Sequence, residues 1–338
     1  MTTQITTKAL PPYSDFLGPR YWPTWLGIGL IWLTARLPFR LQLVLGSGIG
    51  KLLYHLARER RRICRINIGL CFPELDAHSQ EQLVRKTFIA NGIGIMEIGM
   101  GWCRKPEAFR DLVSVEGLEH LLAAHAQGRG VLLVGAHFST IEIAGNLSSL
   151  FYSKNVTYRK HKNPLFETLM TRSRDRLYAA AIERKDVRQA MRSLKEGHIL
   201  WYAPDQDYGP KHSVFVEFFG VPAATITATS RFARLNNSPV IFFHHYRKPD
   251  NSGYHLAYSK PVENFPSGDE HEDARRINAI IEAAVRQHPE QYLWLHKRFK
   301  TQPGGKAASP YRQQNSRQQT SHLQNSQQQP NPQEKGDS

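Results

Sequence analysis

The sequence predicts an α/β protein in which a mainly parallel sheet is flanked by helices. From residue 115 onward, short apolar segments alternate with helical patterns, and this alternation favours parallel strands joined by crossover helices. Residues 131–134 are apolar at every position and are bounded by glycines, which is typical of a strand buried on both faces. A helical pattern directly after this strand fits the same fold class. The later strands can add antiparallel edges.

The other elements of this fold follow in order along the chain. Further strands are expected at 156–158, 198–203, 214–218 and 239–246. Helices are expected at 79–102, at 118–127, from about residue 164, at 187–194 and at 227–235. The 79–102 helix opens with an S-x-x-Q cap pattern at Ser79 and Gln82. Its glycines, at 92, 94, 99 and 101, would let another helix approach closely.

The N-terminal part of the chain has the composition of a membrane-associated segment. Residues 1–18 are polar and lack a signal-peptide pattern, whereas 21–35 are uncharged and rich in Trp, Leu and Ile. As a helix, 21–35 would measure about 22 Å, short of the roughly 30 Å hydrocarbon core. We therefore expect 19–57 to be a membrane-associated helical segment, either single-pass or monotopic. The alternative is an amphipathic helical hairpin packed on the domain.

Charge and cysteine content limit the possible partners. The chain has 338 residues, and 44 Lys and Arg against 29 Asp and Glu give a net charge of +15. This charge favours an anionic membrane, a nucleic acid or an acidic protein. The chain lacks the aromatic and basic motifs of nucleic-acid modules, so no nucleic-acid partner is expected. Its three cysteines form no C-x-x-C pair, and neither a zinc site nor a disulfide framework is predicted.

The composition divides the chain into four parts. The polar residues 1–18 and the apolar segment 19–57 precede a main domain at 58–302. That domain begins with an arginine cluster, which is typical of a cytoplasmic segment near anionic headgroups. The cluster comprises Arg58, Arg60, Arg61, Arg62 and Arg65. Residues 303–338 are rich in Gln and Ser with few apolar side chains, and we expect them to be disordered.

A histidine and a glutamate share the turn that follows the 131–134 strand. His137 lies where the strand must end, and Glu142 lies in the first turn of the next helix. In a catalytic interpretation, His137 is a general base and Glu142 supports the imidazolium. In a structural interpretation, Ser139 and Glu142 form a capping box and His137 is a polar loop residue. This stretch by itself leaves both interpretations open.

Charged residues also follow two other predicted strands. Arg159 follows the 156–158 strand, and Asp205 and Asp207 follow the 198–203 strand. Parallel sheets bind ligands at the carboxyl edge of their strands, so these side chains and His137 should converge there. This convergence favours the catalytic interpretation of His137.

Four longer stretches resemble the bacterial lipid A biosynthesis acyltransferases, with the likeness closest to the lauroyl-transferring members. They are HFSTIE, YRKHKNPLFETLMTRSR, the segment containing WYAPDQDYGP, and PEQYLWLHKRFK. The likeness runs from about Arg20 to Thr301 and includes the family's H-x4-E motif at His137 and Glu142. It implies a glycerolipid-acyltransferase-like fold with an acyltransferase domain at 58–302. The residues between His137 and Glu142 in HFSTIE are not identical to those usual in the lauroyl-transferring members, which leaves acyl and substrate preference open.

The resemblance also implies a reaction and a location. An acyl carrier protein thioester, with no further cofactor, would donate a fatty acyl chain, lauroyl or similar. The acceptor would be a hydroxyl on a hydroxyacyl chain of the Kdo-bearing lipid A precursor. The protein would lie at the anionic bacterial inner membrane, with its catalytic domain on the cytoplasmic side.

Site residues carry over from the family by position. His137 and Glu142 would be the catalytic pair, Arg174 and Asp205 would be needed for activity, and Arg159 would contact a phosphate or sugar. We group Asp207 with Arg159, Arg174 and Asp205 as substrate-binding residues. A rival interpretation is a membrane-associated glycosyltransferase, because Asp205-Gln206-Asp207 is a D-x-D that could hold a divalent metal.

Overall fold

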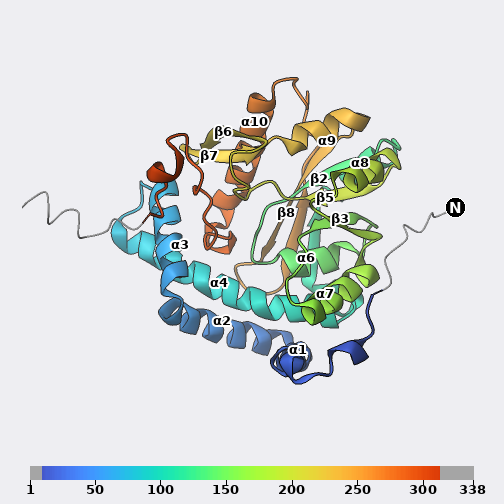
Figure 1. Ribbon diagram of the computed structural model, residues 1–338, viewed down its shortest axis with the longest axis vertical. Coiled ribbons are helices and arrows are strands. Elements are labelled where there is room, and N and C mark those ends of the chain that lie inside the picture. The colour runs from blue at the N-terminus through green and yellow to red at the C-terminus, as the bar shows by residue number, and fades with distance from the viewer. Residues whose placement is uncertain (1–9, 313–338) are drawn as a thin grey trace, which may run out of the picture.

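The core of the protein is a seven-stranded sheet in the order β1-β9-β8-β2-β5-β3-β4 (Figure 1). The computed structural model describes residues 10–312. The strands of the sheet are β1 (Val113–Glu116), β2 (Val131–Val134), β3 (Asn155–Tyr158), β4 (Ala180–Glu183), β5 (Ile199–Tyr202), β8 (Val240–Arg247) and β9 (Tyr254–Tyr258). All neighbouring pairs are parallel except β8 and β9. The predicted α/β class with a mainly parallel sheet is confirmed. The antiparallel pair of later strands lies within the sheet and not at its edge, because β1 pairs with β9.

The described residues 10–312 form ten α-helices (Figure 1). They are α1 (Trp22–Thr34), α2 (Phe39–Leu56), α3 (Arg58–Cys71), α4 (Ala77–Cys103), α5 (Leu118–His125), α6 (Ile141–Ser148), α7 (Pro164–Leu177), α8 (Val187–Lys195), α9 (Ala228–Asn236) and α10 (Glu270–Gln287). The same part of the chain contains five short 3-10 helices: η1 (Tyr13–Phe16), η2 (Pro19–Tyr21), η3 (Pro106–Leu112), η4 (Pro289–Gln291) and η5 (Gly305–Ala308). A separate antiparallel hairpin consists of β6 (Ser213–Phe218) and β7 (Val221–Ile226).

The central strand β2 separates two hydrophobic cores. Leu132 and Val134 belong to a core that also contains residues of α3, α4 and α10. Val131 and Leu133 belong to a second core, with residues of α5 and α6. Alternate side chains of a strand point to opposite faces, so this division places β2 between two apolar layers. The expectation of a strand buried on both faces is confirmed.

Helix α4 crosses under the sheet and uses its glycines for close packing. A Cβ at Gly92 would collide with the backbone of Gly46 and Gly50 in α2. A Cβ at Gly101 would lie 3.1 Å from the carbonyl oxygen of Glu142 in α6. The predicted helix and its close contacts are therefore confirmed. Its cap was predicted wrongly: the N-cap is Asp76, whose Oδ1 accepts from the Ser79 amide at 2.6 Å.

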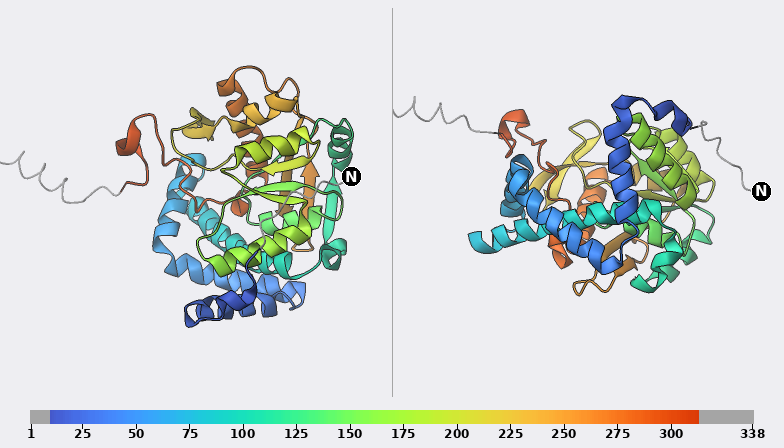
Figure 2. Two further views of the ribbon diagram at one scale, coloured as in Figure 1. Left: turned by 45° about the vertical axis from the view of Figure 1, so that its right-hand side comes forward. Right: turned by 90° about the horizontal axis from the view of Figure 1, so that it is seen from below.

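The apolar N-terminal segment forms two separate helices. Helix α1 has 13 residues and α2 has 18, and together they form a layer beneath α4 (Figure 2). Among residues 10–312, no helix combines the length and the apolar composition needed to cross a membrane. The single-pass alternative is thus not supported in this part of the chain, because the chain turns between 35 and 38 and divides the apolar residues between two helices.

The last described residues, near Tyr311, form contacts with the main domain. Tyr311 is buried, and its hydroxyl accepts from the Phe299 amide at 3.1 Å and donates to the Asn67 side chain. Its carbonyl oxygen accepts from the Arg62 guanidinium at 2.8 Å. Tyr311 therefore packs against α3. Residues 313–338, most of the predicted Gln-rich tail, lie outside the described residues.

Candidate active site

Three neighbouring parallel strands bring the predicted site residues together. Strands β2 and β5 pair in register up to Val134 opposite Tyr202, and β3 pairs with the other side of β5. The loops after these strands carry His137, Asp205 and Arg159. Their carboxyl ends therefore meet at one edge of the sheet, as the sequence predicted.

A cleft of about 610 Å³ lies at this edge. Of the six predicted site residues, four line it: His137, Glu142, Arg159 and Arg174. The other two, Asp205 and Asp207, are buried and do not line it. The cleft also contains several apolar side chains from β5, β7, α8 and α9, namely Tyr202, Ile226, Val187, Ala190 and Phe232. It thus combines a charged part with an apolar part.

The His137 imidazole is fixed by Asp205. Oδ1 of Asp205 lies 2.6 Å from His137 Nδ1, and Oδ2 accepts from the His137 backbone amide at 2.9 Å. A carboxylate can only accept, so Nδ1 carries the proton and Nε2 keeps its lone pair. The Asp205 side chain is 2% exposed and the His137 side chain 25% exposed. The imidazole is therefore held in one tautomer while it remains accessible from the cleft.

Burial and charge act in opposite directions on this pair. Burial by itself lowers the pKa of His137, but the charge and hydrogen bond of Asp205 outweigh it and raise the pKa above 6.5. Burial by itself raises the pKa of Asp205, but the charge and hydrogen bonds of His137 outweigh it and keep the pKa below 3.8. Asp205 therefore stays ionised and favours the protonated state of His137.

Within residues 10–312, Glu142 forms no hydrogen bond with the His137 ring or with the Ser139 amide. Its Oε2 accepts a hydrogen bond from Trp102 Nε1 at 2.9 Å. The Ser139 amide donates to the Gln291 carbonyl oxygen at 2.7 Å, so no capping box forms. Helix α6 begins after Thr140 without a side-chain cap. Glu142 and His137 line the same cleft, and the hydrogen-bond partner of Glu142 is an indole.

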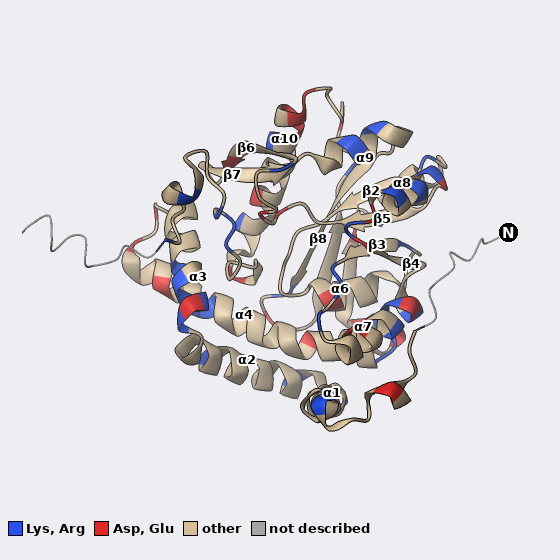
Figure 3. Ribbon diagram, viewed as in Figure 1, with Lys and Arg blue, Asp and Glu red and all other residues tan. Residues whose placement is uncertain are grey.

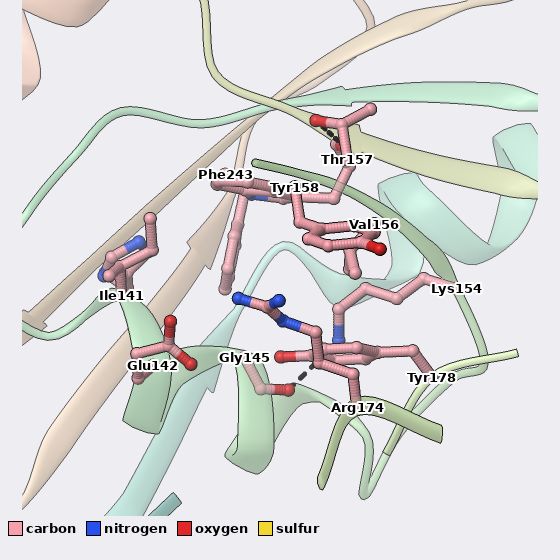
Figure 4. A pocket seen from close by; sticks show the side chains of 12 residues that line it. Ile141, Glu142, Gly145, Lys154, Val156, Thr157, Tyr158, Arg174, Tyr178 and Phe243 are labelled. Atoms are coloured by element: carbon pink, nitrogen blue, oxygen red, sulfur yellow. Dashed lines mark hydrogen bonds between the residues drawn. The ribbon is translucent and has the colours of Figure 1, made fainter. Parts of the chain in front are cut away.

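Arg174 is a buried cation that faces the cleft. It belongs to α7, is 9% exposed, and its Nη1 has no hydrogen-bond partner within residues 10–312. Figure 4 shows its guanidinium in a small recess next to the cleft, between Glu142 and the ring of Tyr158. The guanidinium lies 4.8 Å from the centre of that ring. An uncompensated buried charge is costly, so this geometry suits an anionic ligand group.

Lys154, which sequence reasoning did not single out, lies at the base of the same recess. Its Nζ donates to Ser148 Oγ at 2.6 Å and to the Gly145 carbonyl oxygen at 3.2 Å, near the carboxyl end of α6. Burial lowers the pKa of Lys154 to about 7. No sequence motif marks it, because it precedes an ordinary strand. Its contacts support α6, the helix that carries Glu142.

Asp207 holds a loop together. Its Oδ2 accepts from the Thr301 amide at 2.6 Å, and its Oδ1 accepts from the Thr301 hydroxyl at 2.9 Å and the Gly209 amide at 2.8 Å. Both carboxylate oxygens of Asp205 accept hydrogen bonds from His137. In the described part of the chain, no group of three or more His, Cys, Asp or Glu side chains is placed to hold a metal ion. This arrangement does not favour the D-x-D interpretation.

Comparison with known proteins identifies the family. The model of the bacterial lipid A biosynthesis acyltransferases matches residues 13–301. The chain belongs to this family. The lauroyltransferase of Escherichia coli lipid A biosynthesis is 41% identical over 298 residues, which cover 88% of this chain and 97% of that protein. The family resemblance inferred from the motifs is thus confirmed, and the protein is an acyltransferase.

Two further relatives are named for the transfer of other acyl chains. The E. coli lipid A palmitoleoyltransferase is 40% identical over 295 residues, covering 87% of this chain and 96% of its own. The E. coli lipid A myristoyltransferase is 27% identical over 314 residues, covering 92% and 97%. The acyltransferase therefore resembles the lauroyl and palmitoleoyl enzymes about equally and the myristoyl enzyme less.

Proposed function

We propose that this acyltransferase moves a fatty acyl chain, lauroyl or similar, from acyl carrier protein to the lipid A precursor. The acceptor is a hydroxyl on a hydroxyacyl chain of the Kdo-bearing precursor. The observation that carries the proposal is the His137–Asp205 pair, whose imidazole is accessible in a cleft with both apolar and cationic walls. The names of the relatives support lipid A as the acceptor class.

The chemistry that we propose is direct acyl transfer. His137 Nε2 takes the proton of the acceptor hydroxyl as its oxygen attacks the thioester carbonyl. The tetrahedral intermediate then collapses, the C–S bond breaks, and the departing thiolate takes the proton from the imidazolium. An ester and a free thiol result, with no acyl-enzyme. Asp205 keeps the tautomer fixed and stabilises the imidazolium through Nδ1.

The remaining predicted residues fit substrate binding in this scheme. The guanidinium groups of Arg174 and Arg159 can form bidentate contacts with phosphate or carboxylate groups of the acceptor. Glu142 stays a predicted catalytic residue, and it lines the same cleft as His137. The apolar side chains under α8 and α9 suit the hydrocarbon of a fatty acyl chain.

Mass spectrometry of the reaction products tests the proposed function. The purified acyltransferase is incubated with acyl carrier protein thioesters of several chain lengths and a labelled lipid A precursor. We expect the precursor to gain one acyl unit, and the preferred length identifies the donor. A requirement for a sugar nucleotide, with activity abolished by a chelator, would instead support the glycosyltransferase.

The surface of α1 and α2 suits contact with a bilayer. Large apolar side chains are exposed on both helices: Trp22, Leu26, Leu30 and Leu33 on α1, and Leu41, Val44, Leu52 and Leu56 on α2. The nearby α3 carries the arginine cluster (Figure 3). We propose that these two helices lie on the anionic inner membrane at its cytoplasmic side, with their apolar side chains between the headgroups.

Charged residues on α1 are expected to weaken membrane binding. Leu26 and Leu30 are 68% and 54% exposed, so glutamates at both positions should not disturb the core. We expect the double variant Leu26→Glu/Leu30→Glu to bind anionic vesicles at least tenfold more weakly in a flotation assay, since burying each leucine contributes about 2 kcal/mol. Leu122→Glu, at an exposed position on α5, is the matched control. Equal vesicle binding by the wild type and both variants would exclude this surface as the membrane contact.

A further inference from the structure

Trp102 is the one hydrogen-bond partner that the structure records for the Glu142 carboxylate within residues 10–312. Trp102 lies in the last turn of α4, with its side chain 6% exposed, and its Nε1 donates to Oε2 over 2.9 Å. No bond from a described residue reaches the other oxygen, Oε1. The carboxylate is thus held at one oxygen by a neutral donor, with the other oxygen available.

We propose that Trp102 is a positioning residue for the acyltransferase reaction. Its indole N–H holds Glu142 on the cleft wall so that Oε1 accepts a hydrogen bond from a hydroxyl or amide of the acceptor lipid. This inference rests on the proposed function. In this proposal the two carboxylates have different roles: Asp205 orients the general base, and Glu142 orients the acceptor lipid.

The two hydrogen-bond networks support this division. Both carboxylate oxygens of Asp205 bind His137, one at Nδ1 and one at the backbone amide. The imidazole Nδ1 therefore needs no second carboxylate. Glu142 lies on the next helix and lines both the cleft and the recess that contains Arg174. An anionic acceptor bound at Arg174 would place its neighbouring donor groups near this carboxylate.

Trp102 is itself fixed by the helices that it connects. Its carbonyl oxygen accepts from Ser173 Oγ at 3.4 Å and from the Arg176 guanidinium, and both donors belong to α7, as does Arg174. Next to it, the Gly101 carbonyl oxygen accepts from the Asn146 side chain of α6 at 2.9 Å. The end of α4 therefore joins α6 and α7. Figure 4 shows Glu142 and Arg174, which these two helices carry, in the same recess with the guanidinium directed towards the side of Glu142.

The role of the N–H is separable from the packing of the ring. The Trp102 ring contacts Phe166 edge-on, with the ring centres 5.4 Å apart, and phenylalanine would keep an aromatic ring there. A Trp102→Phe variant loses the N–H donor, whereas Glu142→Asp moves the carboxylate away from the donor but keeps both the charge and the indole. Two independent changes therefore break the same bond.

Acyl transfer by four proteins tests the inference: wild type, Trp102→Phe, Glu142→Ala and the double variant. We expect Trp102→Phe to lower kcat/KM about tenfold through a higher KM for the acceptor, with the KM for the donor unchanged. In the Glu142→Ala background the same substitution should change kcat/KM less than twofold, because its target is gone. A tenfold loss in both backgrounds, or none in wild type, would overturn the inference.

Trp294→Phe is the matched control. Trp294 is fully buried, and its Nε1 donates to the Pro289 carbonyl oxygen at 2.7 Å, so this substitution removes the same bond elsewhere. Its effect should be equal in the wild-type and Glu142→Ala backgrounds. If Trp102→Phe does not fold, Glu142→Asp decides, since full activity of that variant refutes the positioning role. If the wild type transfers no acyl group, the proposed function fails, and this inference with it.

Discussion

Replacing His137 by alanine is expected to lower kcat/KM for acyl transfer at least about a hundredfold, because the general base is lost. The fall should appear mainly in kcat, since His137 acts on the proton that moves in the transition state. Circular dichroism should stay close to wild type, but thermal stability should fall, because the buried Asp205 carboxylate loses the imidazole that compensates its charge. Rates are measured with an acyl carrier protein thioester and the lipid A precursor.

His125 supplies the control for this variant. It is an exposed histidine in the last turn of α5, away from the cleft, and His125→Ala should keep wild-type activity. A His137→Ala protein that folds normally and transfers acyl groups at the wild-type rate would show that another group accepts the proton.

Replacing Asp205 by asparagine should lower kcat/KM by a similar factor and move its pH dependence. The asparagine has nearly the same shape but no charge, and its amide can present a donor to Nδ1 and stabilise the wrong tautomer. In the wild type, His137 must lose its proton to act as a base, and its pKa is raised above 6.5. Activity should therefore rise with pH through that raised pKa.

The direction of the pH shift follows from the opposing effects on His137. Without the Asp205 charge, burial is the main remaining influence, and burial lowers the pKa of the imidazole. The acid limb of the kcat/KM profile of Asp205→Asn should therefore move to lower pH than in wild type. An unchanged acid limb would mean that His137 is not the titrating base.

Asp207→Asn separates this effect from a general loss of carboxylate charge. Asp207 lies two residues away, but its side chain binds Thr301 and Gly209 and does not line the cleft. We expect this variant to lower thermal stability and to leave the acid limb in place. A shift of equal size in both variants would point to a non-specific electrostatic effect.

Local patterns predicted much of the fold and of the site. The apolar 131–134 segment and the alternation after it predicted the buried strand β2 and the parallel sheet. The charged residues that follow the strands predicted the edge at which His137, Arg159 and Asp205 meet. These inferences succeeded because strand period and burial are properties of short segments, and because parallel strands end at a common edge.

Pairings between distant residues could not be predicted in the same way. Asp205 lies 68 residues from His137, and Trp102 lies 40 residues from Glu142. Sequence reasoning paired His137 with Glu142, because they are neighbours in the chain. No local pattern shows which carboxylate a distant donor will reach, since that depends on how α4, α6 and the loop after β5 pack.

The sequence by itself determined the fold class and the enzyme family, and four of the six site residues that it predicted line the cleft. Only the tertiary structure decided which carboxylate holds the His137 ring. It also showed that Arg174 is a buried cation whose Nη1 has no hydrogen-bond partner among the described residues. Finally, it showed that the apolar N-terminal segment consists of two helices. The reason is physical. Composition and periodicity describe segments of a few residues and therefore predict local structure, whereas hydrogen bonds and burial depend on contacts between residues that are distant in the chain.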